Sequence, residues 1–300
     1  MLAGWCDPWR ILKSLLSRVS PDLTRRLRTF GYAAKKRLID TFFAYGVEEI
    51  ESCLHHMGVE RGNTIMVHSS FNPMSGFRGP PGQLVQALLN VVGPTGNILM
   101  VSLPYTSSTH EYLKTAPHFD VRKTLSRMGL VSETFRRRAD VIRSLSPTHP
   151  VLALGPKASW IVAGHEDCLY PCGPGSPFEK LAQLDGKVVF FGVPFETFTF
   201  FHYLEHQVRN EIGFPLYFSA PADIPVMDYQ GKNRIIRSYV FSSEAISRRR
   251  LQILIAELNR RHSIRKKRVG NTRILLVKTS EAIRCTEEMT KSRIFFYDSV

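Results

Sequence analysis

The segment between residues 64 and 101 constrains the fold of this chain more than any other. Apolar residues predict a short strand at Thr64–His68, which ends at a polar Ser-Ser pair. Apolar residues then recur at helical spacing from Gly82 to Val92, stop at Gly93, and are followed by a second apolar strand at Asn97–Val101. A strand, a helix and a strand within about forty residues form a crossover unit, which joins two parallel strands. The sequence therefore predicts an α/β domain that contains a parallel strand pair.

A third strand is expected at Lys187–Val193, and a helix opens soon after it, near Thr199. In parallel sheets of this kind, ligands bind beyond the carboxyl ends of the strands. We therefore expect one edge of the sheet to carry the functional site. The polar residues expected at that edge are His68, Ser69, Ser70, Tyr105, Thr106 and His202.

The region from residue 107 to 186 is rich in proline, glycine and serine, and it is too long for a plain loop unless it carries function. We expect it to form walls of the substrate and cofactor sites. Strands are expected at 217–229 and 235–241. The segment 248–268 contains nine Lys and Arg residues and a single acid, Glu257. This pattern favours a surface helix, with a nucleic-acid or membrane face as the alternative.

Residues 1–42 are predicted to be a basic helical extension in front of a main domain at 43–300. Apolar residues repeat at helical spacing from Ile11 to Val19, and a second, basic helix is expected after Ser20-Pro21. A basic amphipathic helix can lie on an anionic membrane surface. The alternative is a helix that packs on the main domain and turns its charged face to solvent.

The net charge of +14 at pH 7 favours anionic partners, such as phosphates, anionic sugars or lipid headgroups. Nucleic acid is the rival explanation for this charge. No zinc finger, helix-turn-helix or RNP-type pattern accompanies the basic segments. The sequence therefore argues against nucleic acid as the main partner.

Apolar runs such as residues 188–191 fall far short of the about 20 residues that a membrane-spanning helix needs. Charged residues interrupt the apolar N-terminus around Trp5 and Trp9, so no secretory signal is expected. The five cysteines suit reduced thiols, and the close pair Cys168 and Cys172 lacks a second pair of zinc ligands. We expect a cytoplasmic protein without a metal, with peripheral association at the inner face of the membrane as the alternative.

His202 and Glu205 form the strongest catalytic candidate. They stand three residues apart, so on a helix their side chains share one face and can meet. A carboxylate beside an imidazole fixes its tautomer and raises its basicity, as a general base requires. No Gly-x-Ser-x-Gly nucleophile elbow and no Gly-x-Gly-x-x-Gly or Gly-x-x-x-x-Gly-Lys phosphate loop occurs in the chain. The pair is therefore a candidate for general acid–base chemistry, and no serine-nucleophile motif accompanies it.

A series of short segments, in order and spacing, resembles the aminoglycoside 3-N-acetyltransferase family, whose fold differs from that of the GNAT acetyltransferases. The segments, from the first expected strand onward, are Val67-His68-Ser69-Ser70-Phe71, Gly82 to Gly93, Gly96, Pro104-Tyr105-Thr106, Phe119-Asp120, Met128-Gly129, Glu133-Thr134-Phe135-Arg136, Arg143-Ser144, Gly175-Ser176-Pro177, Gly192-Val193, Thr199, His202 and Glu205. The resemblance implies an α/β/α fold, with a mixed, largely parallel central sheet flanked by helices.

The resemblance also implies acetyl transfer from acetyl-CoA to a primary amine in a ternary complex. His202 would act as the general base, Glu205 would orient it, and the hydroxyl of Thr199 or backbone amides would stabilise the oxyanion. For the serines, helix and loop capping is the alternative role. By resemblance, the CoA path would be formed by His68, Ser69, Ser70, Tyr105, Thr106, Ser144 and Ser176, and the acceptor would face Asp120 and Glu133.

One motif departs from the family pattern. Family members usually read Arg-Ser-x-His-Pro, whereas this chain has Ser146 at the histidine position and His149 three residues later. This departure and the positive charge make a neutral or anionic acceptor our first expectation: an amino sugar of a nucleotide-linked, lipid-linked or polysaccharide precursor. An aminoglycoside, held by a local acidic pocket of Asp120, Glu133 and Glu205, is the alternative. A non-catalytic nucleic-acid or membrane-binding protein on the same fold is a second alternative, and a homodimer is left open.

Overall fold

The structure is a computed structural model that describes residues 31, 37–115 and 117–298. The chain divides into two units, Met1–Ala44 and Tyr45–Val300, and each is described by itself. In the first unit, residues 37–42 are helical. The helices predicted from Ile11 to Val19 and after Ser20-Pro21 fall largely outside the described residues, so the basic N-terminal extension stays a prediction.

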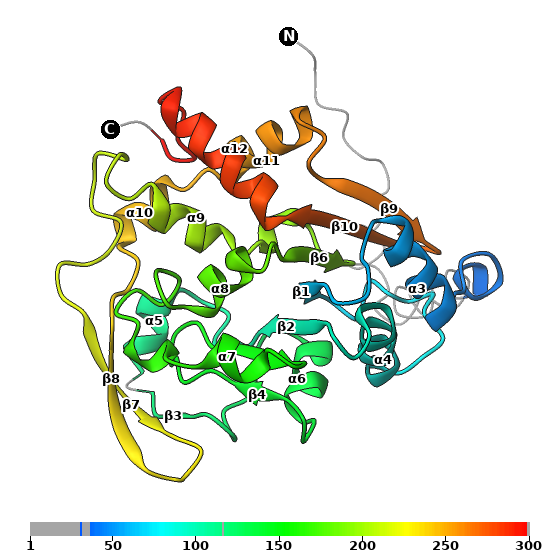
Figure 1. The fold of residues 1–300 in the computed structure, drawn as a ribbon, viewed down its shortest axis with the longest axis horizontal. Helices are drawn as coiled ribbons and strands as arrows, with labels where there is room; N and C mark the ends of the chain where they lie inside the picture. The colour runs from blue at the N-terminus through cyan, green and yellow to red at the C-terminus, as the bar shows by residue number, and fades with distance from the viewer. Residues whose placement is uncertain (1–30, 32–36, 116, 299–300) are drawn as a thin grey trace, which may run out of the picture. The chain divides into compact units, whose positions relative to one another are not determined.

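A seven-stranded sheet in the order β4-β5-β2-β1-β6-β10-β9 forms the centre of the second unit (Figure 1). β1 pairs in parallel with both β2 and β6, while the four remaining pairings are antiparallel. The mixed α/β class and the predicted crossover unit are confirmed, with parallel pairing confined to the three central strands. The strands are β1 Thr64–Ser69, β2 Asn97–Val101, β4 Ile142–Arg143, β5 Val151–Leu154, β6 Lys187–Phe191, β9 Arg265–Val269 and β10 Thr272–Lys278.

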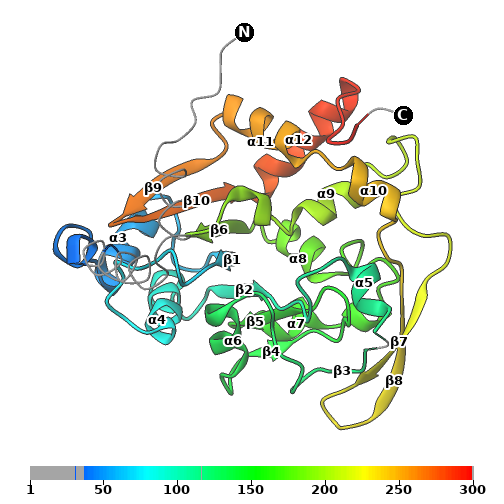
Figure 2. The same cartoon turned by 180° about the vertical axis from the view of Figure 1, so that it is seen from behind.

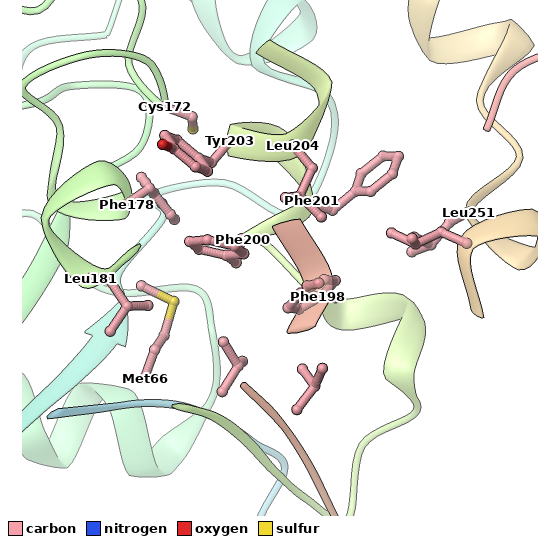
Figure 3. Packing of buried hydrophobic residues seen from close by; sticks show 14 of the residues in the cluster. Met66, Cys172, Phe178, Leu181, Phe198, Phe200, Phe201, Tyr203, Leu204 and Leu251 are labelled. Carbon is pink, nitrogen blue, oxygen red and sulfur yellow. The ribbon is translucent and has the colours of Figure 1, made fainter. Parts of the chain in front are cut away.

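Helices cover both faces of this sheet because its central strands are apolar on both sides. On β1, Ile65 and Val67 enter one buried cluster and Met66 enters the other. Figure 3 shows part of the second cluster, in which Met66 points toward the aromatic side chains of Phe178 and Phe200. The first face carries α3 Val47–His56, α4 Pro81–Val92 and α6 Leu130–Arg136, and the second carries α7 Ala158–Val162, α8 Pro177–Gln183, α9 Phe201–Gln207, α11 Leu251–Arg260 and α12 Thr279–Lys291.

A second, three-stranded sheet has the order β3-β7-β8. It combines β3 Phe119–Asp120 with a hairpin of β7 Ala222–Met227 and β8 Asn233–Ser238, which accords with the predicted strand regions. The hairpin lies at the side of this unit away from α3 and α4 (Figure 1 and Figure 2). Its own small core consists of Phe119, Val121, Val226 and Ile236.

Two segments differ from the sequence-based expectation. Residues 107–186 were expected to form walls of the site. They contain regular structure, including α5 Thr109–Leu113 and the strands β4 and β5, and these two strands form one end of the central sheet. The basic segment 248–268 is helical only in part: α10 Ser243–Arg248 ends there, α11 follows, and Arg265–Val269 is strand β9. The run Arg-Lys-Lys-Arg hides this strand because it has no apolar alternation, and only pairing with the apolar β10 reveals it.

Short 3-10 helices at His165–Asp167 and Phe195–Thr197 complete the regular structure of the region around the site. Within the described ranges, no helix is both long enough and apolar enough to cross a membrane.

Candidate active site

Helix α9 brings His202 above the carboxyl end of β6. The chain leaves β6 through Gly192, whose φ of +62° suits a residue without a side chain, and the 3-10 helix follows. The N–H of His202 then donates to the carbonyl of Thr199 at 3.0 Å, in the turn that opens α9. Phe201 and Leu204 are buried and anchor the helix on the sheet. The predicted position of His202 near a helix N-terminus is confirmed.

His202 contacts the fully buried carboxylate of Glu205, with 2.7 Å between Nδ1 and Oε2. Arg249 donates to both oxygens of the same carboxylate, at 2.6 Å and 2.9 Å, and the hydroxyl of Tyr297 donates as well. Burial alone would raise the pKa of Glu205, but Arg249 and His202 outweigh it and hold the pKa below its usual value. Glu205 is therefore an ionised group deep in the domain.

The protonation state of His202 follows from this arrangement. An ionised carboxylate only accepts hydrogen bonds, so Nδ1 of His202 carries the proton and Nε2 keeps the lone pair. Burial lowers the pKa of His202 from its usual 6.5, and Glu205 opposes this shift. The imidazole is thus neutral near pH 7, with Nε2 ready to accept a proton.

Arg249 and Tyr297 were not identified from the sequence. They lie 44 and 92 residues from Glu205 along the chain, and no local spacing connects them with α9. A basic residue that precedes α11 and a tyrosine close to the C-terminus carry no recognisable signal on their own. Only the tertiary fold makes them partners of the carboxylate.

His149 lies edge-on to His202, with 5.5 Å between the ring centroids, and both rings contact Phe241. It is buried, which lowers its pKa well below the usual 6.5, and the nearby His202 adds to this shift. The N–H of His149 donates to Oγ of Ser146 at 3.2 Å. The altered family motif therefore brings one histidine beside the candidate base and uses the serine to hold the loop.

His68, Ser69 and Ser70 lie at the carboxyl end of β1, on the edge predicted for the CoA path. The imidazole of His68 stacks on Phe190 of β6, with 5.3 Å between the ring centroids. Burial lowers the pKa of His68 to about 4, so the ring is neutral. The structure thus brings these three residues to the same edge as His202.

The other residues predicted for the CoA path have internal hydrogen bonds. The hydroxyl of Tyr105 lies 2.7 Å from both Oγ1 of Thr109 and the carbonyl of Thr148. Ser144 accepts from the N–H of Val151 and contacts His165, while Ser176 caps α8. Thr106 is exposed. These hydrogen bonds cap a helix and support loops. The binding of CoA by Tyr105, Thr106, Ser144 and Ser176 stays a prediction.

The two carboxylates predicted to face the acceptor have partners within the chain. Asp120 accepts from the backbone N–H groups of Arg122 and Lys123, which closes a turn. Glu133 accepts from Arg136 and Arg137, and these bonds, with that to Arg136 the largest cause, lower its pKa to about 2. Neither group therefore presents an unpaired negative charge.

Thr199 was predicted to help stabilise the oxyanion. Its hydroxyl donates to the carbonyl of Thr197 at 3.3 Å, which is a long bond. The hydroxyl is partly exposed and can exchange this bond for another acceptor. Its role as an oxyanion donor stays a prediction.

Five buried polar atoms have no hydrogen-bond partner within the part of the chain that the structure describes: His68 Nε2, Ser102 Oγ, Arg143 Nε, Thr148 Oγ1 and His149 Nδ1. Buried polar groups in folded proteins nearly always have a partner, so such a set calls for a bound polar molecule or ordered water. His68 lies on β1, Ser102 follows β2, Arg143 lies on β4, and Thr148 and His149 precede β5. Among the described residues, no group of three or more His, Cys, Asp or Glu side chains is placed to hold a metal ion.

Comparison with known proteins identifies a family for most of the chain. The family model described as aminoglycoside 3-N-acetyltransferase matches residues 66–291. Aminoglycoside N(3)-acetyltransferase III of Salmonella sp is 30% identical over 168 residues, which cover 52% of this chain and 58% of that protein. The chain therefore spans less than two thirds of the length of this curated relative.

Solved structures share the fold. The aminoglycoside acetyltransferase AAC(3)-Xa superimposes with a TM-score of 0.73 at 22% identity, covering 86% of this chain and 98% of the other. AAC-IIIb in a binary complex with CoASH has a TM-score of 0.69 at 22% identity, covering 85% and 99% of the two chains. Because the family model covers most of the described domain, the comparison establishes membership, and the chain belongs to the aminoglycoside 3-N-acetyltransferase family.

Proposed function

We propose that this protein transfers an acetyl group from acetyl-CoA to a primary amine of an amino sugar. One observation carries the proposal: the neutral imidazole of His202 is held by an ionised, fully buried carboxylate, which is itself fixed by Arg249. An ammonium group cannot attack a thioester, so the acceptor must first lose a proton. His202 Nε2 has the lone pair that can accept this proton, because Nδ1 holds the ring proton against Glu205.

The remaining residues of the site have positioning roles in this proposal. Glu205 keeps the proton on Nδ1 and stabilises the imidazolium that forms when Nε2 takes the proton from the amine. His149 and Phe241 enclose the imidazole and limit access of water to it. The thioester carbonyl is then attacked directly by the amine, and the CoA thiolate leaves. Family membership and the CoA complex of AAC-IIIb support acetyl-CoA as the donor.

Aminoglycosides are the first acceptor class that we propose, because the relatives named above are aminoglycoside acetyltransferases. Aminoglycosides therefore replace the amino sugars of nucleotide-linked, lipid-linked or polysaccharide precursors as our first acceptor class. The names of the relatives reported above mention no such precursor. A specific observation keeps a second class in consideration: Asp120, Glu133 and Glu205 are all engaged by N–H or cationic groups of the chain. These three carboxylates therefore contribute less to the binding affinity of a polycation than unpaired carboxylates would. This favours an amino sugar with neutral or anionic substituents.

The experiment is a thiol-release assay with acetyl-CoA and a panel of aminoglycosides, free amino sugars and nucleotide-linked amino sugars. We expect one class to give turnover, and His202→Ala to lower kcat by ~10²-fold or more while CoA affinity changes only a few-fold. Thr197→Val is the matched control, because Thr197 is exposed, lies just before the same helix and donates its hydroxyl only to the carbonyl of Pro194; it should change kcat little.

The possible results separate the alternatives. Equal loss of CoA binding and turnover in His202→Ala would make this histidine structural. Absence of CoA binding by the wild type, together with salt-sensitive nucleic-acid binding, would favour the non-catalytic alternative on the same fold.

A further inference from the structure

Residues 296–298, which we call the clasp, pair with the segment that carries Arg249. The N–H of Arg250 donates to the carbonyl of Phe296 at 2.8 Å, beside an antiparallel bridge between Arg249 and Tyr297. Residues directly opposite each other in an antiparallel pair have their side chains on the same face. The bridge therefore turns the side chains of Arg249 and Tyr297 to the same side, where both reach Glu205.

Aromatic contacts hold the clasp against the rest of the domain. Phe296 is buried and meets the ring of Phe201 on α9 edge-on, with 4.8 Å between the ring centroids. Tyr297 is buried as well, and its ring meets that of Phe214 edge-on at 5.1 Å. The hydroxyl of Tyr297 is thus placed at the carboxylate by a packed segment.

The hydroxyl of Tyr297 completes the set of donors around Glu205. Oε2 accepts from Nδ1 of His202 and from Nη2 of Arg249. Oε1 accepts from Nε of Arg249 and from the hydroxyl of Tyr297. Each oxygen therefore has two donors, and the carboxylate loses some of these bonds if it rotates. Arg249 is a charged donor, whereas the hydroxyl of Tyr297 stabilises the carboxylate without adding a positive charge.

The groups around this carboxylate leave little other charge to act on it. Among the described residues, the other titratable groups that face Glu205 or His202 are Arg249, Tyr217, Cys172 and His149. Burial raises the pKa of Tyr217, of Cys172 and of Tyr297 itself, so all three keep their protons near pH 7. Burial also keeps His149 neutral, because it lowers the pKa of that imidazole. Arg249 is thus the charged partner of Glu205, and Tyr297 is its neutral one.

We propose that Tyr297 is a positioning residue that sets the basicity of His202 through Glu205. The inference rests on the proposed function, in which His202 is the general base. A donor on Oε1 stabilises the ionised carboxylate and so weakens its attraction for the proton on Nδ1. The imidazole then stays neutral, and able to accept a proton from the amine, down to a lower pH. The family model matches residues 66–291, so Tyr297 lies beyond the segment that this chain shares with the model.

The test compares the wild type, Tyr297→Phe and Tyr45→Phe by the acidic limb of kcat/KM and by NMR titration of the His202 imidazole. In Tyr297→Phe, both midpoints should move upward by roughly half a pH unit, opposite in direction to the shift expected for Glu205→Gln. Tyr45→Phe is the matched control, because it also removes a buried hydroxyl, which contacts Thr272 in the cluster on the other face of the sheet. It should lose a similar part of the free energy of unfolding and keep the wild-type midpoints.

The outcomes separate this inference from the proposed function. Midpoints that stay at the wild-type value or move downward in Tyr297→Phe would overturn the inference, and so would an equal upward shift in Tyr45→Phe. Failure of Tyr297→Phe to fold would make the tyrosine structural and would overturn it as well. Absence of turnover by the wild type would overturn the proposed function, while the NMR titration, with the resonance assigned by its loss in His202→Ala, would still test the influence of Tyr297 on the imidazole.

Discussion

Arg249 donates two hydrogen bonds to the buried carboxylate of Glu205, from Nε at 2.6 Å and from Nη2 at 2.9 Å. The guanidinium also lies over the ring of Phe241, 5.4 Å from its centroid. Arg249 stands between α10 and α11, so a segment remote in sequence fixes the group that orients His202. The geometry of the candidate base therefore depends on the last third of the chain as well as on α9.

Replacing Arg249 by methionine should destabilise the protein strongly. The change leaves Glu205 as a buried charge with fewer partners, and breaking a buried ion pair typically costs about 3–5 kcal/mol. Urea unfolding measures the loss. Arg237→Met, which removes the exposed pair with Asp223, serves as the control and should change the free energy of unfolding little. Similar losses in both variants would mean that the Arg249–Glu205 pair contributes no more than a surface contact.

The pH profile of the reaction should report His202. Burial holds its pKa below the usual 6.5, so kcat/KM should rise with pH through a value below 6.5 and be level near pH 7. In Glu205→Gln, the carboxylate that favours the imidazolium is gone, and the acidic limb should move to lower pH while the plateau falls. Steady-state rates with the accepted amine, over the pH range in which both proteins stay folded by circular dichroism, give the comparison. A limb that moves upward would contradict the assigned contact.

Glu133 should make stability depend on pH. Its folded-state pKa is about 2, below the usual 4.5, mainly because of the hydrogen bond from Arg136. A group with a depressed folded pKa adds stability above its unfolded pKa and loses it as the pH falls toward the folded value. Glu133→Gln should therefore be less stable than the wild type at pH 7, and the difference should shrink between pH 4.5 and 2. Thermal unfolding of both proteins across this pH range measures the difference in stability. If that difference grows as the pH falls, ionised Glu133 does not stabilise the fold.

The parts of the fold that sequence predicted are those with strong local periodicity. The apolar runs at β1 and β2 and the amphipathic α4 define the crossover unit without help from the rest of the chain. β4 Ile142–Arg143 and β5 Val151–Leu154 are too short for a pattern, and β9 is almost wholly basic, so each is a strand only because a neighbour pairs with it. The sequence therefore predicted the parallel strands at the centre of the seven-stranded sheet, but not the antiparallel strands β4, β5 and β9 at its two ends.

The candidate site divides in the same way. His202 and Glu205 lie on one helix, so their spacing was sufficient to predict their contact. Arg249 and Tyr297 reach Glu205 from elsewhere in the fold, and no local pattern identifies them. For Asp120 and Glu133, residue type alone suggested an acidic pocket for the acceptor. In the structure, neighbouring groups of the chain donate hydrogen bonds to both carboxylates, which the sequence did not reveal.

Restoring the family histidine at position 146 should damage this protein. Ser146 is buried, and its Oγ accepts the N–H of His149, whose ring meets that of His202 edge-on. An imidazole is much larger than a hydroxymethyl group at this buried position, so we expect Ser146→His to lower the free energy of unfolding by ~1–3 kcal/mol through overpacking and to lower kcat by displacing His149. Ser146→Ala loses only the hydrogen bond and should cost about 0.5–1.5 kcal/mol with little change in kcat. The free energy of unfolding and kcat are measured for both variants. A stable Ser146→His protein with raised kcat would mean that the loop accommodates the larger side chain and that the family histidine supports the reaction in this chain.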